Sequence, residues 1–321
     1  MTKITPADVT EWNAALETCP HATYFHSYEW ADVWRQYKGV VPRAKRIEFS
    51  DGRTLILPCS YLPSRHGLRK QVFMSPAGTF GGALYNAGIT EAHLALVVGE
   101  IKKFAHVAWR QNPYEPLLHA VWPADARKDV THALELSDSF ETLYKSWTKG
   151  HRSAVHKARR EGVAVKLAST LEDWLAYYRI YEDSLRRWGD QASSSYEWKL
   201  FHDLCLRNSA RMKLWVAMYQ QTIIAGALCF YTNKHVAYWH GAALEQYFHL
   251  RPVNLLLFEA IQHACTEGYT WFDFNPSGGH EGVAKFKQSF GGKVYESSML
   301  IHKSILTKAI ESIGKPLIWL V

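Results

Sequence analysis

The chain has 321 residues, of which 47% are hydrophobic and 21% are charged, and its formal net charge is +7. This composition excludes extensive disorder, and the length allows two compact domains. No apolar run is long enough to cross a bilayer and the N-terminus lacks a signal-peptide core, so we expect a cytoplasmic protein. Five scattered cysteines without C-x-x-C, and sixteen histidines without H-E-x-x-H, indicate neither a disulfide framework nor a metal site.

The first half of the chain predicts two helices followed by strands. Helical periodicity covers 6–18 and 27–37, and Ser27 is a suitable N-cap for the second helix. Apolar and β-branched runs then predict further elements, namely strands at 43–49, 54–62 and 70–74, a helix near 90–110 and a strand at 117–122. The turn-rich segment at 123–129 is a candidate domain boundary.

A strongly basic stretch, residues 143–166, opens the second half. It holds seven lysines or arginines against one acid, Glu161. As a helix it places Lys149, Arg152, His156, Arg159 and Arg160 on one face and Trp147, Ala154, Val155 and Ala158 on the other. A basic face beside an apolar anchor suits RNA, phosphate groups or an anionic membrane surface, and a solvated helix face is the alternative.

The rest of the second half alternates helices and strands. The predicted order is a strand at 163–168, helices at 171–187 and 196–208, strands at 212–219, 222–231 and 235–243, a helix at 252–267, a strand at 271–274, a short helix at 281–290 and a strand at 293–302. The tail at 305–321 reads as an amphipathic helix. It either docks on the body of the protein or makes a peripheral membrane contact.

The glycine-rich segment at 278–292 is the most informative part of the sequence. It follows the apolar strand at 271–274, and Gly278 and Gly279 then lead into a short helix that carries Lys285 and Lys287. Open α/β sheets usually hold their ligands at such a strand end, and a helix start favours anions. The alternative is an ordinary connection with two solvated lysines.

The order of these elements, together with several segments, resembles the Fem (FemAB-type) aminoacyltransferases and the wider GNAT-like acyltransferases. The segments that carry the resemblance are GHRSAVHKARREGV (150–163), YWHGAA (238–243), RPVNLLL (251–257), GYTWFDFN (268–275) and GVAKFKQSFGG (282–292), with FHSYEW (25–30) and SPAG (75–78) in the first half. The resemblance implies an α/β (α+β) fold of two tandem GNAT-like domains, with mixed sheets flanked by helices. We place these domains at 1–140 and 141–303, followed by a helical tail at 304–321.

The resemblance also implies the transfer of an activated acyl group to an amine acceptor, without a cofactor. The favoured donor is aminoacyl-tRNA and the acceptor a small or lipid-linked amine, such as a cell-envelope or natural-product precursor. The alternatives are an acyl-CoA N-acyltransferase and a non-catalytic binding module on the same fold. Leu250–Asn254 stand where GNAT enzymes carry the R/Q-x-x-G-x-G/A loop that grips the CoA pyrophosphate, which favours tRNA over CoA.

By the same resemblance, Lys287 is the first candidate for a catalytic residue, because its ammonium can stabilise an oxyanion or the leaving oxygen. Phe286 would pack on the acceptor or on the lysine, with ordinary core packing as the alternative. Asp273 would assist proton transfer, or would only order the loop that follows it. The candidates for substrate or phosphate contacts are Arg152, Lys157, Arg159, Arg160, Arg186, Arg187, Arg251, Asn254, Gly278 and Gly279. For Arg186 and Arg187 the alternative is a surface ion pair.

Overall fold

The computed structural model describes residues 3–63, 70–137, 139–189, 192 and 194–303. The chain divides into two compact units, each with its own sheet. One unit comprises Met1–Val130 and Glu296–Val321, and the other comprises Thr131–Tyr295. Across the described residues, no helix combines the length and the apolar character that a bilayer span requires.

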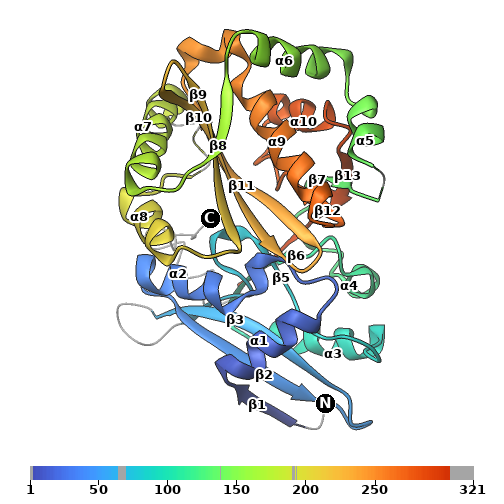
Figure 1. The fold of residues 1–321 in the computed structure, drawn as a ribbon. Coiled ribbons are helices and arrows are strands. Elements are labelled where there is room, and N and C mark those ends of the chain that lie inside the picture. The colour runs from blue at the N-terminus through green and yellow to red at the C-terminus, as the bar shows by residue number, and fades with distance from the viewer. Residues whose placement is uncertain (1–2, 64–69, 138, 190–191, 193, 304–321) are drawn as a thin grey trace. The chain divides into compact units, whose positions relative to one another are not determined.

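The first unit is a mixed sheet with helices on both faces (Figure 1). Its strand order is β1 (Lys3–Ala7), β2 (Val41–Glu48), β3 (Thr54–Pro63), β4 (Lys70–Phe73), β6 (His106–Gln111) and β14 (Met299–Lys303), and the short β5 (Phe80–Gly81) also pairs with β6. Its helices are α1 (Val9–Thr18), α2 (Tyr28–Lys38), α3 (Glu91–Ile101) and α4 (Pro116–Val121). Residues of α1 and α2 pack with Ala44 and Ile56 on one face of the sheet, and α3 packs with Ile47 and Leu57 on the other.

The second unit has a second mixed sheet. Its strand order is β13 (Lys293–Glu296), β7 (Val130–Glu135), β12 (Trp271–Asp273), β11 (His235–Ala243), β10 (Thr222–Thr232), β9 (Met212–Tyr219) and β8 (Ala164–Leu167). Its helices are α5 (Phe140–Ser146), α6 (Lys149–Arg160), α7 (Leu171–Trp188), α8 (Trp198–Arg207), α9 (Pro252–Thr266) and α10 (Glu281–Gln288). The pairing of β11 with β12 is parallel, whereas β8 to β11 form an antiparallel meander.

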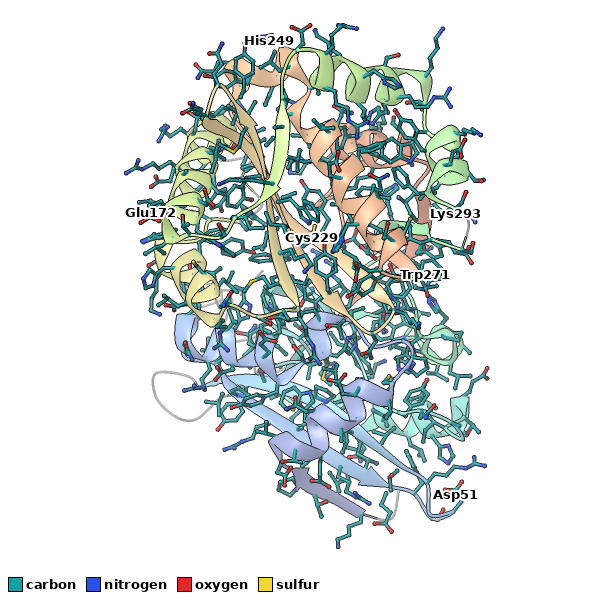
Figure 2. The ribbon with its side chains drawn as sticks, viewed as in Figure 1. Asp51, Glu172, Cys229, His249, Trp271 and Lys293 are labelled. Atoms are coloured by element: carbon teal, nitrogen blue, oxygen red, sulfur yellow. The ribbon has the colours of Figure 1, made fainter. Side chains whose placement is uncertain are left out.

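Alternation along β10 explains how the second sheet is covered. Ala225 and Ala227 are fully buried in the core that includes α9, whereas Gly226, between them, faces Tyr177 of α7. A Cβ atom at Gly226 would lie 2.3 Å from the Tyr177 ring, so α7 can pack this closely only against a glycine. In Figure 1, α7 and α8 accordingly lie on one side of this sheet and α9 on the other. Figure 2 shows Cys229 inside the unit and Glu172 and Lys293 at its periphery.

The strongly periodic elements agree with the sequence prediction. The meander β9 to β11 and helix α9 match the predicted elements within one residue, and Ser27 caps α2 by accepting the Trp30 N–H at 3.0 Å. Three segments were predicted wrongly, because short apolar runs do not distinguish strand from helix. The predicted strand at 117–122 is helix α4, the helix at 90–110 contains both α3 and β6, and the strand at 293–302 is two strands in different sheets.

The compact units also differ from the expected domain limits at 140/141 and 303/304. Strand β7 joins the second sheet by pairing with β12, and β14 returns to the first sheet to pair with β6. The second unit therefore runs from Thr131 to Tyr295. The helix expected in the tail, at 304–321, lies outside the described residues.

Candidate functional site

Asn275 organises the loop that follows β12. Its backbone N–H donates to Asp273 Oδ1 at 2.5 Å, and its carbonyl oxygen accepts from Lys287 Nζ at 2.6 Å. Its side-chain amide donates to the carbonyl oxygen of Tyr238 on β11 at 2.9 Å. One residue thus connects two of the three predicted catalytic side chains with the neighbouring strand.

The backbone of this loop depends on residues that tolerate positive φ. Asn275, Gly278 and Gly279 have φ values of 57°, 59° and 84°. This left-handed conformation costs most L-residues about 1–2 kcal/mol, whereas glycine adopts it freely and asparagine tolerates it. A Cβ atom at Gly279 would meet nothing within 4 Å, so backbone conformation, rather than space, requires glycine there. The loop then enters α10, which carries Phe286 and Lys287.

Lys287 is buried, with 4% of its surface exposed, and Asp273 is also buried, at 1%. Asp273 Oδ1 accepts a second hydrogen bond from Thr131 Oγ1, at 2.7 Å. His132, on the same strand as Thr131, contacts Gln288 through Nε2 at 3.2 Å. Burial and, next, the charge of Lys287 hold the pKa of His132 below its usual range, so this imidazole stays neutral at pH 7. The surroundings of Lys287 are therefore polar.

Phe286 packs against one aromatic residue of α6 and one in the turn after α10. Its ring centroid lies 5.1 Å from that of His151 on α6 and 5.1 Å from that of Phe290. His151 Nδ1 lies 3.2 Å from Asn254 Nδ2 in the first turn of α9. Burial first, and the charge of Arg251 second, lower the pKa of His151. Phe286, Asn254 and Arg251 are thus linked through His151.

The start of α9 has the features of an anion site. The helix runs for 15 residues, its N-cap is Arg251 at φ 60°, and no side chain caps it. Pro252 has no N–H, and the first-turn N–H groups of Val253 and Asn254 lack acceptors within the helix. The exposed Arg251 adds a positive charge to this positive end of the helix dipole.

The basic stretch forms α6, but its charges are not all equally available. Arg159 pairs with Glu259 on α9 at 2.9 Å and lies over the Phe258 ring, 4.4 Å from its centroid. Arg152 donates to the carbonyl oxygen of Lys145. Arg160 is 73% exposed, 3.9 Å from Glu161, and Lys157 is half-buried. Arg159 therefore joins α6 to α9, and Arg160 points to solvent.

The predicted helix at 143–166 is interrupted, which corrects the place of one anchor. Trp147 lies between α5 and α6 rather than on α6, and it is 2% exposed. Its ring packs against Phe290 with centroids 4.6 Å apart. Val155 and Ala158 form the buried side of α6, as the periodicity predicted.

Arg186 and Arg187 lie in the last turn of α7. Arg186 pairs with Asp183 at 3.1 Å, and Arg187 lies 3.7 Å from the same carboxylate. The Arg187 guanidinium also stacks over Phe248, 5.0 Å from its ring centroid. These contacts match the surface ion pair that was the alternative, and substrate contact by either arginine stays a prediction.

Four residues that complete these two clusters were not predicted as site residues from the sequence, namely Thr131, His132, His151 and Asn275. His151 and Asn275 stand inside segments that carry the family resemblance, so a signal for them was present. Thr131 and His132 precede the expected domain limit at 140 and carried no such signal. The network around Asn275 and the contacts of His151 together form the candidate site. Its catalytic and binding roles stay predictions.

One protein-family model matches part of this chain, and several solved structures share its fold. Residues 145–288 match the family model of the acetyltransferase (GNAT) domain, and no curated protein sequence matches the chain. The crystal structure of FemX superposes with a TM-score of 0.73 at 12% identity, over 98% of this chain and 100% of that one. The structure of L-PGS from Bacillus licheniformis gives 0.55 at 13% identity, over 95% and 96%.

A tandem GNAT protein from the clavulanic acid biosynthesis pathway gives a TM-score of 0.51 at 9% identity, over 93% of this chain and 98% of that one. At such identities the likeness is one of fold, and it confirms the expected pair of GNAT-like domains. The matched family model covers α6, the antiparallel meander, α9 and all of α10. The second unit of this chain therefore carries a GNAT acetyltransferase domain, and the fold of the whole chain is similar to that of FemX.

Proposed function

We propose that this acyltransferase moves an aminoacyl group from aminoacyl-tRNA to the amine of a small or lipid-linked acceptor, such as a precursor of the cell envelope or of a natural product. The observation that carries the choice of donor is the backbone at Leu250–Asn254, where the turn η4 (Glu245–Leu250) leads into α9. By the family resemblance, these residues stand where CoA-dependent relatives wrap a glycine loop around a pyrophosphate.

The backbone of η4 leaves few donors for a pyrophosphate. The N–H of Tyr247 donates to Leu244 and the N–H of Arg251 donates to Phe248, both at 3.1 Å. Pro252 has no N–H to offer. These N–H groups are used inside the turn, whereas a pyrophosphate loop points several of them at the ligand. The positive charges of α6 and Arg251 remain, and they suit the spaced phosphates of an RNA better than a single buried pyrophosphate.

The chemistry requires a neutral amine, alignment of the two substrates and a stabilised oxyanion. The amine nitrogen attacks the ester carbonyl carbon and forms the new C–N bond. The C–O bond to the ribose oxygen then breaks, and that oxygen takes up the proton that the amine loses. We assign to the Lys287 ammonium the stabilisation of the negative charge that develops on oxygen. Asn275 holds it in place, and Asp273 holds Asn275.

A second candidate, acyl transfer from acyl-CoA, is favoured by the uncapped start of α9 beside Arg251. The two candidates differ in which donor protects the folded protein, because a ligand raises the apparent stability by mass action. We expect the unfolding temperature to rise with aminoacyl-tRNA, to rise less with uncharged tRNA, and to stay constant with acyl-CoA. A rise with acyl-CoA alone would select the second candidate. No rise with any donor and no transfer would indicate a binding module without the chemistry.

A further inference from the structure

One face of the sheet in the first unit is only partly covered by its helix. Cross-strand pairing puts Lys45 opposite Leu57 and Arg43 opposite Cys59, so these side chains share a face with Ile47. Helix α3 covers the end of this face around Ile47 and Leu57. Its 11 residues span about 16 Å, whereas the ten residues of β3 span about 33 Å. In the part of the chain that the structure describes, the residues that line the far end of this face belong to strands and to the loop after α3, and none belongs to a helix.

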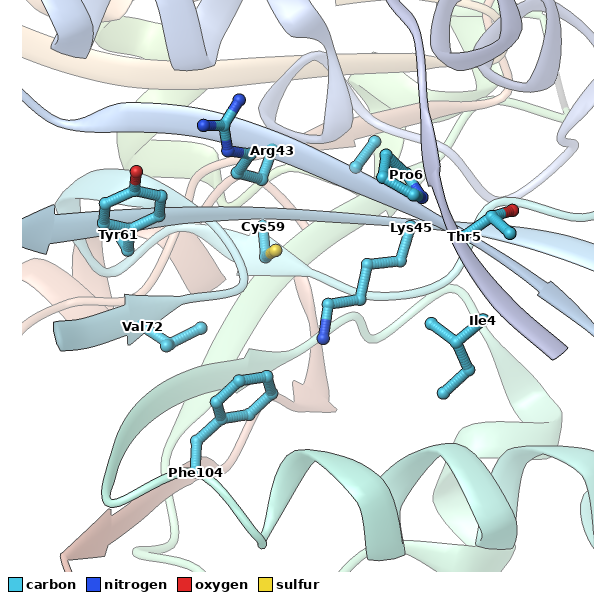
Figure 3. A pocket seen from close by; sticks show the side chains of 10 residues that line it. Ile4, Thr5, Pro6, Arg43, Lys45, Cys59, Tyr61, Val72 and Phe104 are labelled. Atoms are coloured by element: carbon cyan, nitrogen blue, oxygen red, sulfur yellow. The ribbon is translucent and has the colours of Figure 1, made fainter.

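A cavity of about 350 Å³ occupies this uncovered end (Figure 3). Its lining is mainly apolar and includes Ile4, Cys59, Val72 and Phe104. Cys59 and Val72 also belong to the core under α3, so the core continues directly into the floor of the cavity. A smaller cavity of about 210 Å³ shares Ile4, Lys45 and Phe104 with it. The larger volume is at the lower end of the range for small-molecule sites, about 300–1,000 Å³.

Two cations stand in this apolar lining. Lys45 extends across the cavity toward Phe104, and its Nζ lies 4.5 Å from the centroid of that ring (Figure 3). Arg43 lies at the rim beside Tyr61, 5.8 Å from the ring centroid. The described residues supply no carboxylate to this lining. Burial raises the pKa of Cys59 to about 11, and the charges of Lys45 and Arg43 act in the opposite direction, which places both cations within electrostatic reach of the floor.

We propose that this cavity binds a monocarboxylate with a single hydrocarbon chain, such as a medium-chain fatty acid. The chain would lie on Val72, Cys59 and Ile4, and the carboxylate would replace the Phe104 ring as the partner of Lys45. The ion pair would form beside a low-dielectric wall, where it is stronger than in water. A carboxylate matches one ammonium, whereas a phosphate is usually held by a cluster of donors. The site uses residues of the first unit only and is independent of the proposed acyl transfer.

The test is isothermal titration of decanoate, below its micelle concentration, into the full chain. We expect saturable binding to the wild type, at least about tenfold weaker binding to Lys45→Met, and retained affinity in Lys45→Arg. Lys38→Met is the matched control, because Lys38 lies over the Tyr37 ring at 4.2 Å in the same unit but outside the cavity. Decanol, which lacks the charge, should bind the wild type and Lys45→Met equally weakly.

The position of the ligand is read from cysteine alkylation, followed by peptide mapping at alkaline pH. Saturating decanoate should slow the modification of Cys59 about tenfold or more, while Cys265 of the second unit keeps its rate. Equal affinity of decanoate for the wild type and Lys45→Met, or unprotected Cys59, would overturn the proposal. So would phosphatidylglycerol vesicles that bind through Lys45 when decanoate does not, because the site would then be a phospholipid contact.

Discussion

In the second unit, Lys287 Nζ donates a 2.6 Å hydrogen bond to the backbone carbonyl oxygen of Asn275, twelve positions earlier in the chain. The bond joins α10 to the loop that follows β12. A buried ammonium needs such a partner, because an unpaired charge in the interior is costly. It also means that the residue proposed to stabilise the oxyanion is held by the same loop that the glycines shape. The proposed catalytic role of Lys287 therefore depends on the conformation of this loop.

Replacing Lys287 should affect both the rate of transfer and the stability of the fold, and the two effects can be measured separately. We expect Lys287→Met to slow transfer by about 100- to 1,000-fold, the usual effect of losing one oxyanion donor. The variant should also lose about 1–3 kcal/mol of unfolding free energy, because the Asn275 carbonyl loses its partner. Single-turnover rates and denaturant unfolding measure the two effects. Lys285→Met is the control, since Lys285 is 74% exposed and pairs only with Glu281 in the structure described. Wild-type turnover in folded Lys287→Met would remove the assignment.

Asn275 supports the loop after β12 through hydrogen bonds of both its backbone and its side chain. Asn275→Gly keeps the positive φ but loses the bond to Tyr238, whereas Asn275→Ala loses the bond and also strains the backbone. We therefore expect the alanine variant to be about 1 kcal/mol less stable than the glycine variant. Both should transfer more slowly than wild type, because Lys287 is held less firmly. Chemical denaturation measures the stability of the two variants, and single-turnover kinetics measure their rates of transfer. Equal stability of the two variants would argue against backbone strain in Asn275→Ala.

The charges of α6 should determine the salt dependence of tRNA binding. Each phosphate contact adds somewhat less than 1 to the slope of log affinity against log salt. Changing Arg152, Arg159 and Arg160 to glutamate should weaken binding and flatten this slope, although Arg159 will contribute less because it pairs with Glu259. The control is the double variant Lys102→Glu with Lys103→Glu in the first unit, which reverses two charges at a site outside α6. An unchanged slope in the triple variant would exclude α6 from the RNA-binding surface.

Acetyl-CoA should bind poorly. The turn η4 uses its own N–H groups, and Pro252 has none, so we expect a Kd of about 0.1 mM or weaker, equivalent to about 5.5 kcal/mol. Isothermal titration measures it. Arg251→Ala should weaken the residual binding further, because this arginine carries the charge at the start of α9. Saturable micromolar binding of any acyl-CoA would place the CoA-dependent reaction first.

Glu115 makes the stability of the first unit depend on pH. Burial raises the pKa of its carboxyl group to about 8, from an ordinary value of 4.5, against the opposing effect of the Tyr85 hydroxyl. Between these values the unfolded chain releases the proton first, so the unfolding free energy falls as pH rises from 4.5 to 8. Glu115→Gln should therefore be more stable than wild type above pH 8, on the order of a few kcal/mol, and equal below pH 4.5.

Thermal or chemical unfolding as a function of pH measures this difference. Glu91→Gln is the control, because Glu91 is exposed in the first turn of α3. The same pH dependence in both variants would show that Glu115 ionises normally in the folded protein.

The sequence by itself determined the elements whose periodicity is long and regular. The meander β9 to β11, helix α9 with Pro252 in its first turn and the basic helix α6 follow from residue spacing and capping, which are local properties. The resemblance, carried by short segments in a fixed order, identified the acyltransferase fold. The glycine loop and Lys287 were also visible, because glycines at a strand end and a lysine in the next helix are adjacent in the chain.

The tertiary structure decided which distant residues meet. Thr131 reaches Asp273 across 142 positions, and His151 reaches Asn254 across 103, so no local pattern could indicate either contact. It also decided that β13 and β14, two residues apart, pair in different sheets. Strand pairing depends on which backbone groups are left unsatisfied at a sheet edge, and that is known only once the rest of the sheet has formed.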